Sequence, residues 1–288
     1  MNNFFIHYNN SNPSPSSHID VSLVEKIASP DDLFILRGEP NYHPQLHDLL
    51  DVLKNSRLIY TTHAFNIDAL LSYKRTLPYV SFHYDGIQND RIKQQSGLTV
   101  NILRALNAMS SHVSVTRLAY TLSPFNKDWI DGDIGLLRQF YENYRNMKKP
   151  YFLIYQQGKY FSQPNFAWTS INKTFIDHVN RSGILSQKDL QFFLSFFSKV
   201  DYNCLALQDE LVIDWNGDVR LCMSHRWNEI IGNIRDQSLE DIKASTKDIR
   251  QTSQCPVRHQ CWMAYHYKDS IQKMVEQHGN KRESENST

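Results

Sequence analysis

Between residues 20 and 157 the chain alternates short apolar segments with amphipathic ones, and this alternation constrains its fold more than any other feature. Runs such as DLFILR, RLIYTT and YVSFHY have the length and composition of buried strands. Between them lie segments with helical spacing; PQLHDLLDVLKN places Leu46, Leu49, Leu50 and Leu53 on one face. Such an alternation predicts parallel strands with right-handed crossovers, in an open α/β sheet or a barrel.

The expected elements can be placed along the printed sequence. We expect strands within 4–8, 32–40, 57–62, 79–86, 112–121 and 150–156. We expect helices within 20–29, 44–55, 66–76, 98–109, 133–147, 173–183 and 186–200. Residues 9–19 are rich in Ser, Asn and Pro and predict a loop, and the polar tail after residue 268 predicts a helix end followed by disorder.

Polar residues follow several of the expected strands. They form the segments Arg37-Gly38-Glu39-Pro40, Thr61-Thr62-His63 and His83-Tyr84-Asp85-Gly86. Because chemistry in parallel α/β folds sits at the carboxyl ends of strands, these segments are candidates for a site. Glu39, His63, His83 and Asp85 could serve as acid–base groups, although their spacing matches no catalytic signature. Equally, Glu39 could be a loop carboxylate, and of His43, His47, His63 and His83 we expect one or two to point inward.

All four cysteines, Cys204, Cys222, Cys255 and Cys261, lie in the last third of the chain. The chain carries 31 basic and 30 acidic residues, which gives no basic surplus for nucleic acid. Neither a signal peptide nor an apolar span long enough for a membrane is evident. We therefore expect a cytoplasmic protein without nucleic-acid or membrane partners. Clustered cysteines in that compartment are better explained as metal ligands than as disulfides.

The cysteine region has recognisable local structure. Asn216-Gly217 predicts a β-hairpin turn, in which case Cys222 would face Leu211, and Ser238 with Asp241 predicts a capped helix. Four thiolates suit a 4Fe-4S cluster or a tetrahedral zinc ion. No two neighbouring cysteines show the spacing of a zinc knuckle, which favours the cluster. A zinc site remains the alternative, in which His225 or His259 would replace a thiolate.

Several segments together resemble a known family. The run from Cys204 through Gly217 to Cys222, then IIGNIRDQSLEDI and CPVRHQCWMAY, is similar to the SPASM and twitch domains of radical SAM enzymes. Upstream, LFILRGEPNYHPQLHDLLDVLKN resembles the second strand of those enzymes with its Gly-Gly-Glu-Pro motif. LIYTTHA and VSFHYDG resemble the third and fourth strands. The resemblance spans about Leu33 to Tyr265. It implies a partial (β/α) barrel of the radical SAM type with a small C-terminal α+β twitch/SPASM-like domain.

The chain departs from this family at the motif that gives the family its activity. Radical SAM enzymes hold a SAM-cleaving cluster with CxxxCxxC after the first strand, whereas this chain has HYNNSNPSPSSHI there. Arg37 stands in place of the first motif glycine, and His83 in place of a serine that often contacts SAM. The resemblance thus implies at most a vestigial SAM site, formed by Gly38, Glu39, Pro40 and His83. It implies no assignable catalytic residue.

The predicted organisation follows from these segments. We expect a radical SAM-like barrel over 1–160, a helical bridge over 161–202, a twitch/SPASM-like cysteine domain over 203–268, and a tail over 269–288. The predicted function is a divergent radical SAM/SPASM-like iron–sulfur protein without SAM cleavage, holding one auxiliary 4Fe-4S cluster. It would be a pseudoenzyme, or a truncated enzyme that modifies a peptide or metabolite. Its partner would be a peptide, a small molecule or a radical SAM protein. The alternative is a zinc-stabilised, non-enzymatic binding module.

Overall fold

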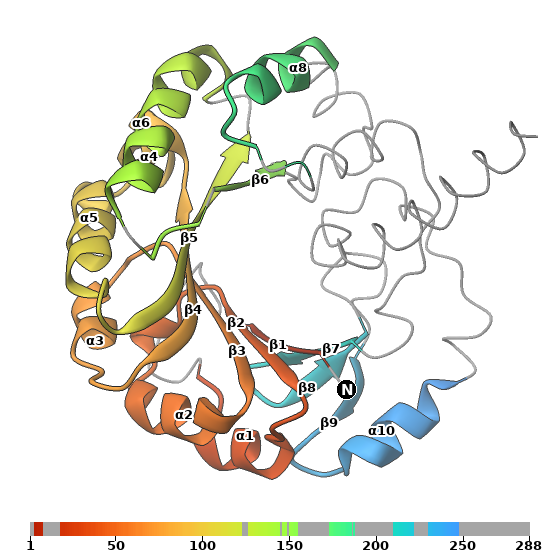
Figure 1. The fold of residues 1–288 in the computed structure, drawn as a ribbon. Helices are drawn as coiled ribbons and strands as arrows, with labels where there is room; N and C mark the ends of the chain where they lie inside the picture. The colour runs from red at the N-terminus through yellow and green to blue at the C-terminus, as the bar shows by residue number, and fades with distance from the viewer. Residues whose placement is uncertain are drawn as a thin grey trace, which may run out of the picture.

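The computed structural model describes residues 3–7, 18–122, 126–144, 146–148, 150–154, 173–185, 187, 210–221 and 230–247. In these residues one curved sheet carries helices on its convex side (Figure 1). The strand order is β6-β5-β4-β3-β2-β1-β7-β8-β9. The bounds are β1 (Asn3–His7), β2 (Leu33–Arg37), β3 (Arg57–Thr62), β4 (Leu77–Tyr84), β5 (Val113–Leu122), β6 (Tyr151–Ile154), β7 (Glu210–Asp214), β8 (Asp218–Arg220) and β9 (Ile230–Asn233).

Most of the helices connect the parallel strands. Their bounds are α1 (Val21–Ile27), α2 (Leu46–Val52), α3 (Ile67–Leu71), α4 (Asn89–Ile92), α5 (Leu98–Ala108), α6 (Ile130–Asn143), α8 (Lys173–Arg181) and α10 (Leu239–Ser245). Short 3-10 turns occur at η1 (Pro40–Tyr42), η2 (Leu53–Asn55), η3 (Gly86–Gln88) and η4 (Lys127–Trp129). Strands β1 to β6 pair in parallel, so the predicted α/β fold with a partial (β/α) barrel is confirmed.

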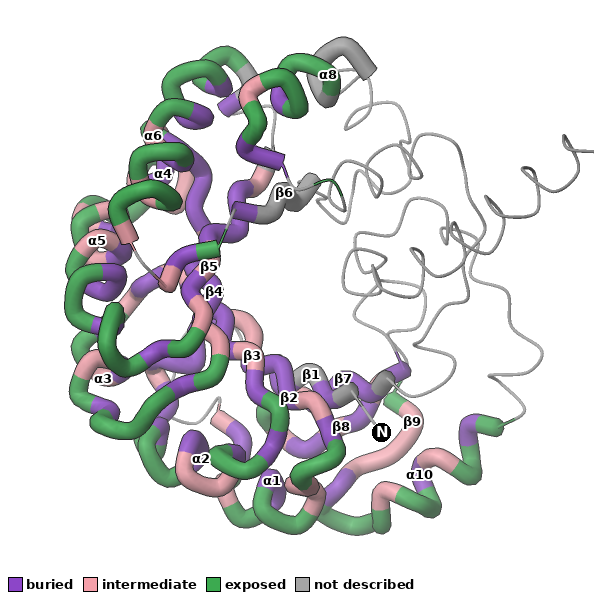
Figure 2. Tube along the Cα trace, in the orientation of Figure 1, coloured by how far each residue is buried: buried purple, intermediate pink, exposed green. Residues whose placement is uncertain are grey.

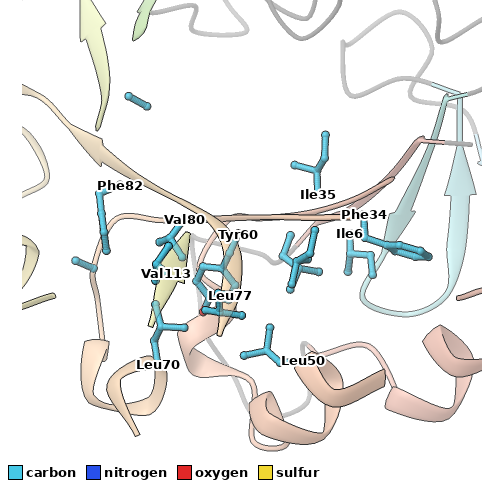
Figure 3. Close-up of a cluster of buried hydrophobic side chains, with 14 of the residues drawn as sticks. Ile6, Phe34, Ile35, Leu50, Tyr60, Leu70, Leu77, Val80, Phe82 and Val113 are labelled. Carbon is cyan, nitrogen blue, oxygen red and sulfur yellow. The ribbon is translucent and has the colours of Figure 1, made fainter. Parts of the chain in front are cut away.

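The main core lies between the sheet and its convex-side helices. Tyr60 of β3 is in register with Val80 of β4, and both are fully buried. Leu50 from α2 and Leu70 from α3 pack into the same cluster (Figure 3). Ile35 points to the other side of the sheet from these helical side chains (Figure 3). Successive strand residues therefore alternate between the helix-covered face and the concave face.

Burial follows this layering along the whole described sheet. Buried positions run along the strands and the inner sides of the helices, while exposed positions gather on the outer sides of the helices (Figure 2). The expected strands within residues 4–8, 32–40, 57–62, 79–86, 112–121 and 150–156 all occur. Reasoning from the sequence did not anticipate α4 or β9, because a four-residue element offers too few positions for a period to show. The expected helix within 186–200 falls almost entirely outside the described residues.

The hairpin of β7 and β8 extends the barrel sheet. β7 pairs in parallel with β1, from Asn3 opposite Glu210 to His7 opposite Asp214. The N-terminal strand therefore lies between β2 and a strand some two hundred residues later in the chain. The proposed division of the chain into domains stays a prediction, and the sheet itself is continuous across β1 and β7.

The hairpin turn differs from the predicted one by a single residue. Val212 pairs with Arg220 and Ile213 with Val219, so the loop has three residues instead of two. The amide of Gly217 donates to the carbonyl of Asp214 at 2.9 Å, and Gly217 has φ of +88°. A type I turn closed by a left-handed glycine accounts for the extra residue. The prediction that Cys222 faces Leu211 rested on a two-residue turn, whereas the described register is shifted by one residue. Cys222 itself lies outside the described residues.

Candidate functional site

Glu39 follows β2 directly and lies at the centre of a buried hydrogen-bond network. Only 3% of its surface is exposed. Its Oε1 accepts from Asn41 Nδ2 at 2.7 Å and also from the hydroxyl of Thr62. Its Oε2 accepts from the amide of His63 at 2.8 Å. A carboxylate offers about four acceptor positions, so the chain itself already uses most of those on Glu39.

Asn41 is the second centre of this network. Its Nδ2 also donates to Thr62 Oγ1 at 2.9 Å and to the carbonyl of Phe65 at 2.6 Å. Its Oδ1 accepts from the hydroxyl of Tyr60 at 2.5 Å. Glu39 and Asn41 thereby join the loop after β2 to the loop after β3. Asn41 was not among the residues predicted from the sequence, although it lies two residues after Glu39 in a loop that follows a strand, and that position is a signal.

His63 and His83 meet at the carboxyl ends of neighbouring strands. Their rings stack with centroids 4.7 Å apart and planes inclined by 21°. His63 Nδ1 lies 3.5 Å from Glu39 Oε2, and 17% of the His63 side chain is exposed. The structure thus brings together three of the four candidate acid–base groups. A histidine beside a buried carboxylate has the arrangement of an oriented general base.

The other two histidines, His43 and His47, make hydrogen bonds away from the stacked pair. His43 Nε2 lies 2.8 Å from the carbonyl of Ile19, and the amide of Gln45 donates to His43 Nδ1 at 3.0 Å. Burial lowers the pKa of His43, which favours the neutral ring that this bonding pattern requires. His47 lies against the carbonyl of Ala69, away from the stacked pair. The expectation that one or two of the four histidines point inward agrees with this arrangement.

Asp85, the fourth candidate, lies in the loop after β4 and is held by an ion pair. Lys93 Nζ lies 2.8 Å from Asp85 Oδ2, and 4% of the Asp85 side chain is exposed. The Asp85 amide donates to Asn89 Oδ1 at 3.0 Å. Asp85 is therefore bound within its own loop.

A buried carboxylate from α6 fastens the same loop. Asp133 is fully buried; its Oδ1 accepts from the amide of Ile87 at 2.6 Å and its Oδ2 from the hydroxyl of Tyr120 at 2.5 Å. A Cβ on Gly86, whose φ is +80°, would lie 1.9 Å from Asp133 Oδ2. Burial raises the pKa values of Asp133 and of Tyr120. The Asp85-Gly86 turn predicted from the sequence therefore requires a glycine, because Asp133 occupies the space that a side chain at position 86 would need.

The proposed metal ligands fall outside the described residues. Cys204, Cys222, Cys255 and Cys261 lie there, and so do His225 and His259. The last described residue before Cys222 is Leu221, which is buried next to the end of β8. Among the described residues, no group of three or more His, Cys, Asp or Glu side chains could hold a metal ion.

The structure describes all four residues of the expected SAM site, but Glu39 among them already makes several hydrogen bonds within the chain. Gly38 has φ of +87°, and Pro40 begins η1 and is buried. Glu39 already accepts hydrogen bonds from Asn41, Thr62 and His63, so a SAM ammonium would have to share the Glu39 oxygens with these donors. His83 faces the stacked His63. The fit to SAM at Glu39 is therefore weaker than the motif alone indicates, and the site residues stay a prediction.

Comparison with known proteins found one matching protein family and several similar solved structures, but no matching curated protein. The SPASM family, described as an iron-sulfur cluster-binding domain, matches residues 204–263. No curated protein matches the chain. Native anSMEcpe with bound AdoMet is similar in structure, with a TM-score of 0.58 at 12% identity, over 90% of this chain and 88% of that chain. Native anSMEcpe with bound AdoMet and Cp18Cys peptide gives 0.55 at 12% identity, over 90% and 87%.

At 12% identity the structural similarity establishes the fold alone. The chain shares the fold of anSMEcpe, and its residues 204–263 match the SPASM family. The predicted fold and the predicted SPASM-like cysteine segment are thereby confirmed. In the described part of the chain, no helix combines the length and the apolar character needed to span a membrane.

Proposed function

We propose that this chain is a radical SAM-type barrel that binds a ligand but does not itself cleave SAM, and that it holds one auxiliary 4Fe-4S cluster. One observation supports this most directly. The SPASM match covers residues 204–263 and includes Cys204, Cys222, Cys255 and Cys261, whereas residues 1–203 contain no cysteine. Four thiolates suffice for one cluster, and the three needed to hold a SAM-cleaving cluster are absent from the barrel sequence.

The auxiliary cluster would be held by the four cysteines. An iron–sulfur cluster supplies electron transfer or structural cross-linking when bound. The chain's own residues would bind and orient the ligand at the carboxyl ends of the strands. Gly38, Glu39, Pro40 and His83 would line this position, with SAM or another polar molecule as the ligand.

The ligand that we favour is a peptide. Two of the anSMEcpe structures that resemble this chain contain a bound peptide, Cp18Cys in one and Kp18Cys in the other. A barrel that retains its shape without the SAM-cleaving cluster could present a peptide to a true radical SAM partner protein. A small metabolite is the other candidate ligand. The cytoplasmic location also remains a prediction.

The proposal is tested by metal content and by product analysis. The protein is purified anaerobically and reconstituted with iron and sulfide, and iron, sulfide and zinc are then measured. We expect about four iron and four sulfide per chain, reduced to background in a variant with all four cysteines changed to serine. With SAM and dithionite added, we expect no 5′-deoxyadenosine. One zinc per chain without iron would instead support the zinc-stabilised binding module, and 5′-deoxyadenosine formation would contradict the pseudoenzyme proposal.

A further inference from the structure

Glu39, His63 and His83 lie in a row at the carboxyl ends of β2, β3 and β4. The register of β3 with β4, continued by one residue past its last pair, sets His63 opposite His83. Their rings stack with centroids 4.7 Å apart, and Nδ1 of His63 lies 3.5 Å from Glu39 Oε2. One face of the His63 ring is thus covered by a second imidazole, and its Nδ1 edge is directed at a carboxylate.

Glu39 presents a hydrogen-bond acceptor to His63. Its Oε1 accepts from Asn41 and Thr62, and its Oε2 from the amide of His63. Both oxygens therefore act as acceptors, as they do in an ionised carboxylate. Because a lone pair on Nδ1 would face this negative charge, the neutral His63 ring carries its proton on Nδ1. The lone pair then lies on Nε2.

Nε2 of His63 is the nitrogen that a ligand can reach. Within the described residues, the His63 ring lies against Glu39, the stacked His83 and, at 6.1 Å between ring centroids, Phe65. None of these contacts is a hydrogen bond to Nε2, and 17% of the side chain is exposed. In the buried His43, by contrast, both ring nitrogens lie within hydrogen bonds. His63 thus combines an orienting carboxylate with an accessible nitrogen.

The loop that carries His63 is fixed on both sides of the residue. Thr62 Oγ1, which donates to Glu39, accepts from the amide of Ala64 at 2.9 Å. The carbonyl of Ala64 accepts from Asn101 Nδ2 at 3.1 Å, which joins the loop to α5. Ala64 is fully buried and has φ of +67°, a left-handed conformation that is unfavourable for an L residue. Such strain persists where the surrounding structure fixes the backbone, so the His63 ring is oriented before a ligand arrives.

We propose that His63 is a base of this barrel, and that its Nε2 accepts a proton from an O–H or N–H group of the ligand. The ligand's O–H or N–H bond breaks, its electron pair stays on the ligand, and an N–H bond forms at Nε2. Glu39 is the positioning residue, because it holds the Nδ1 proton and balances the charge of the imidazolium. Such carboxylate–histidine contacts are often long without ligand and shorten when it binds. This deepens the function proposed above and rests on its assumption that a ligand binds at the strand ends.

The first measurement identifies the tautomer in the wild-type full chain. Nitrogen NMR of isotope-labelled histidine, at a pH where the ring is neutral, distinguishes a protonated ring nitrogen from one with a lone pair. We expect His63 to carry its proton on Nδ1. His43 is the internal control with the opposite tautomer, because its Nδ1 accepts from the amide of Gln45 at 3.0 Å. The signals of His63 are assigned by their loss in His63→Gln.

The second measurement is the reactivity of Nε2 towards diethyl pyrocarbonate, which acylates a lone-pair ring nitrogen and releases ethanol and carbon dioxide. Peptide mass spectrometry gives the rate at each histidine, and the exposed His112 serves as the reference in every variant. We expect His63 to be modified, and Glu39→Gln to slow its modification about tenfold or more, since hydrogen bonds to charged groups are among the strongest. The matched control is Asp68→Asn, which removes an exposed carboxylate paired with Arg104 and should leave the His63 rate unchanged.

Three results would each overturn the proposal: a proton on Nε2 of neutral His63, no modification of His63, or an equal His63 rate in Glu39→Gln. Circular dichroism verifies that the variants are folded. If Glu39→Gln does not fold, the tautomer and the modification of the wild type decide the question. Iron and sulfide are measured on the same preparation. Four iron per chain together with a proton on Nε2 would leave the proposed function standing and remove only this inference.

Discussion

Replacement of Gly86 by alanine should destabilise the protein strongly, because the space beside this glycine is filled by a carboxylate. An alanine Cβ would lie 1.9 Å from Asp133 Oδ2 and 2.2 Å from Asp133 Cγ, closer than any real contact. The residue also has φ of +80°, a conformation that costs an L residue about 1–2 kcal/mol. Asp133 would have to move and lose its bonds from Ile87 and Tyr120.

The magnitude follows from these two parts. Hydrogen bonds to a charged group are worth about 1.5–3 kcal/mol each, so losing two costs about 3–6 kcal/mol. With the backbone strain, Gly86→Ala should lower the free energy of unfolding by about 4–8 kcal/mol. A typical domain has only about 5–15 kcal/mol in total. The midpoint of thermal unfolding should fall by about 7–13 °C.

Gly97 provides a matched control. It has φ of +85°, yet an added Cβ there would meet nothing within 4 Å. Gly97→Ala therefore carries the backbone strain without the steric conflict, and its midpoint should fall by about 5 °C or less. Thermal unfolding followed by circular dichroism compares the two variants.

A double-mutant cycle tests the cause. In an Asp133→Ala background the obstacle to a Cβ at position 86 is gone, so Gly86→Ala should then cost about as little as Gly97→Ala. The reasoning is refuted if Gly86→Ala is as mild as Gly97→Ala in the wild-type background, or if its cost is unchanged when the Asp133 carboxylate is removed.

Three further predictions concern the buried network, a buried histidine and a helix cap. Asn41→Asp places a second carboxylate where Nδ2 now lies 2.7 Å from Glu39, and should cost about 3–5 kcal/mol; a thermal midpoint close to the wild-type value would contradict this. Burial lowers the pKa of His43, so its contribution is present above the unfolded-state pKa of about 6.5 and is lost as the pH falls below it. In denaturant titrations between pH 5 and 8, His43→Gln should flatten that decline, and an unchanged slope would exclude the assignment. Ser238 caps α10 by accepting from the Asp241 amide at 3.1 Å, so Ser238→Ala should lower the free energy of unfolding by about 1 kcal/mol; no measurable loss in urea would show that this helix end does not limit stability.

The sequence by itself determined the local elements of this protein. The period of apolar residues located β1 to β6 and most helices between them, because buried positions recur along a strand or helix with the period of that element. Asn216-Gly217 identified the hairpin and Ser238 the cap of α10 for the same reason: each depends on residues within a few positions. The absence of cysteine before residue 204 is likewise a property of the sequence alone.

Only the tertiary structure decided which distant residues meet. The Asp133 bond to Ile87 joins positions 46 residues apart, and the pairing of β1 with β7 joins strands that are far apart in the sequence. The stack of His63 on His83 depends on the register of two strands, which no local pattern encodes. Even the hairpin shows this limit, because one extra turn residue shifts every cross-strand pair and turns each side chain to the other face. Local periodicity therefore specifies the elements, while register and long-range packing specify the site.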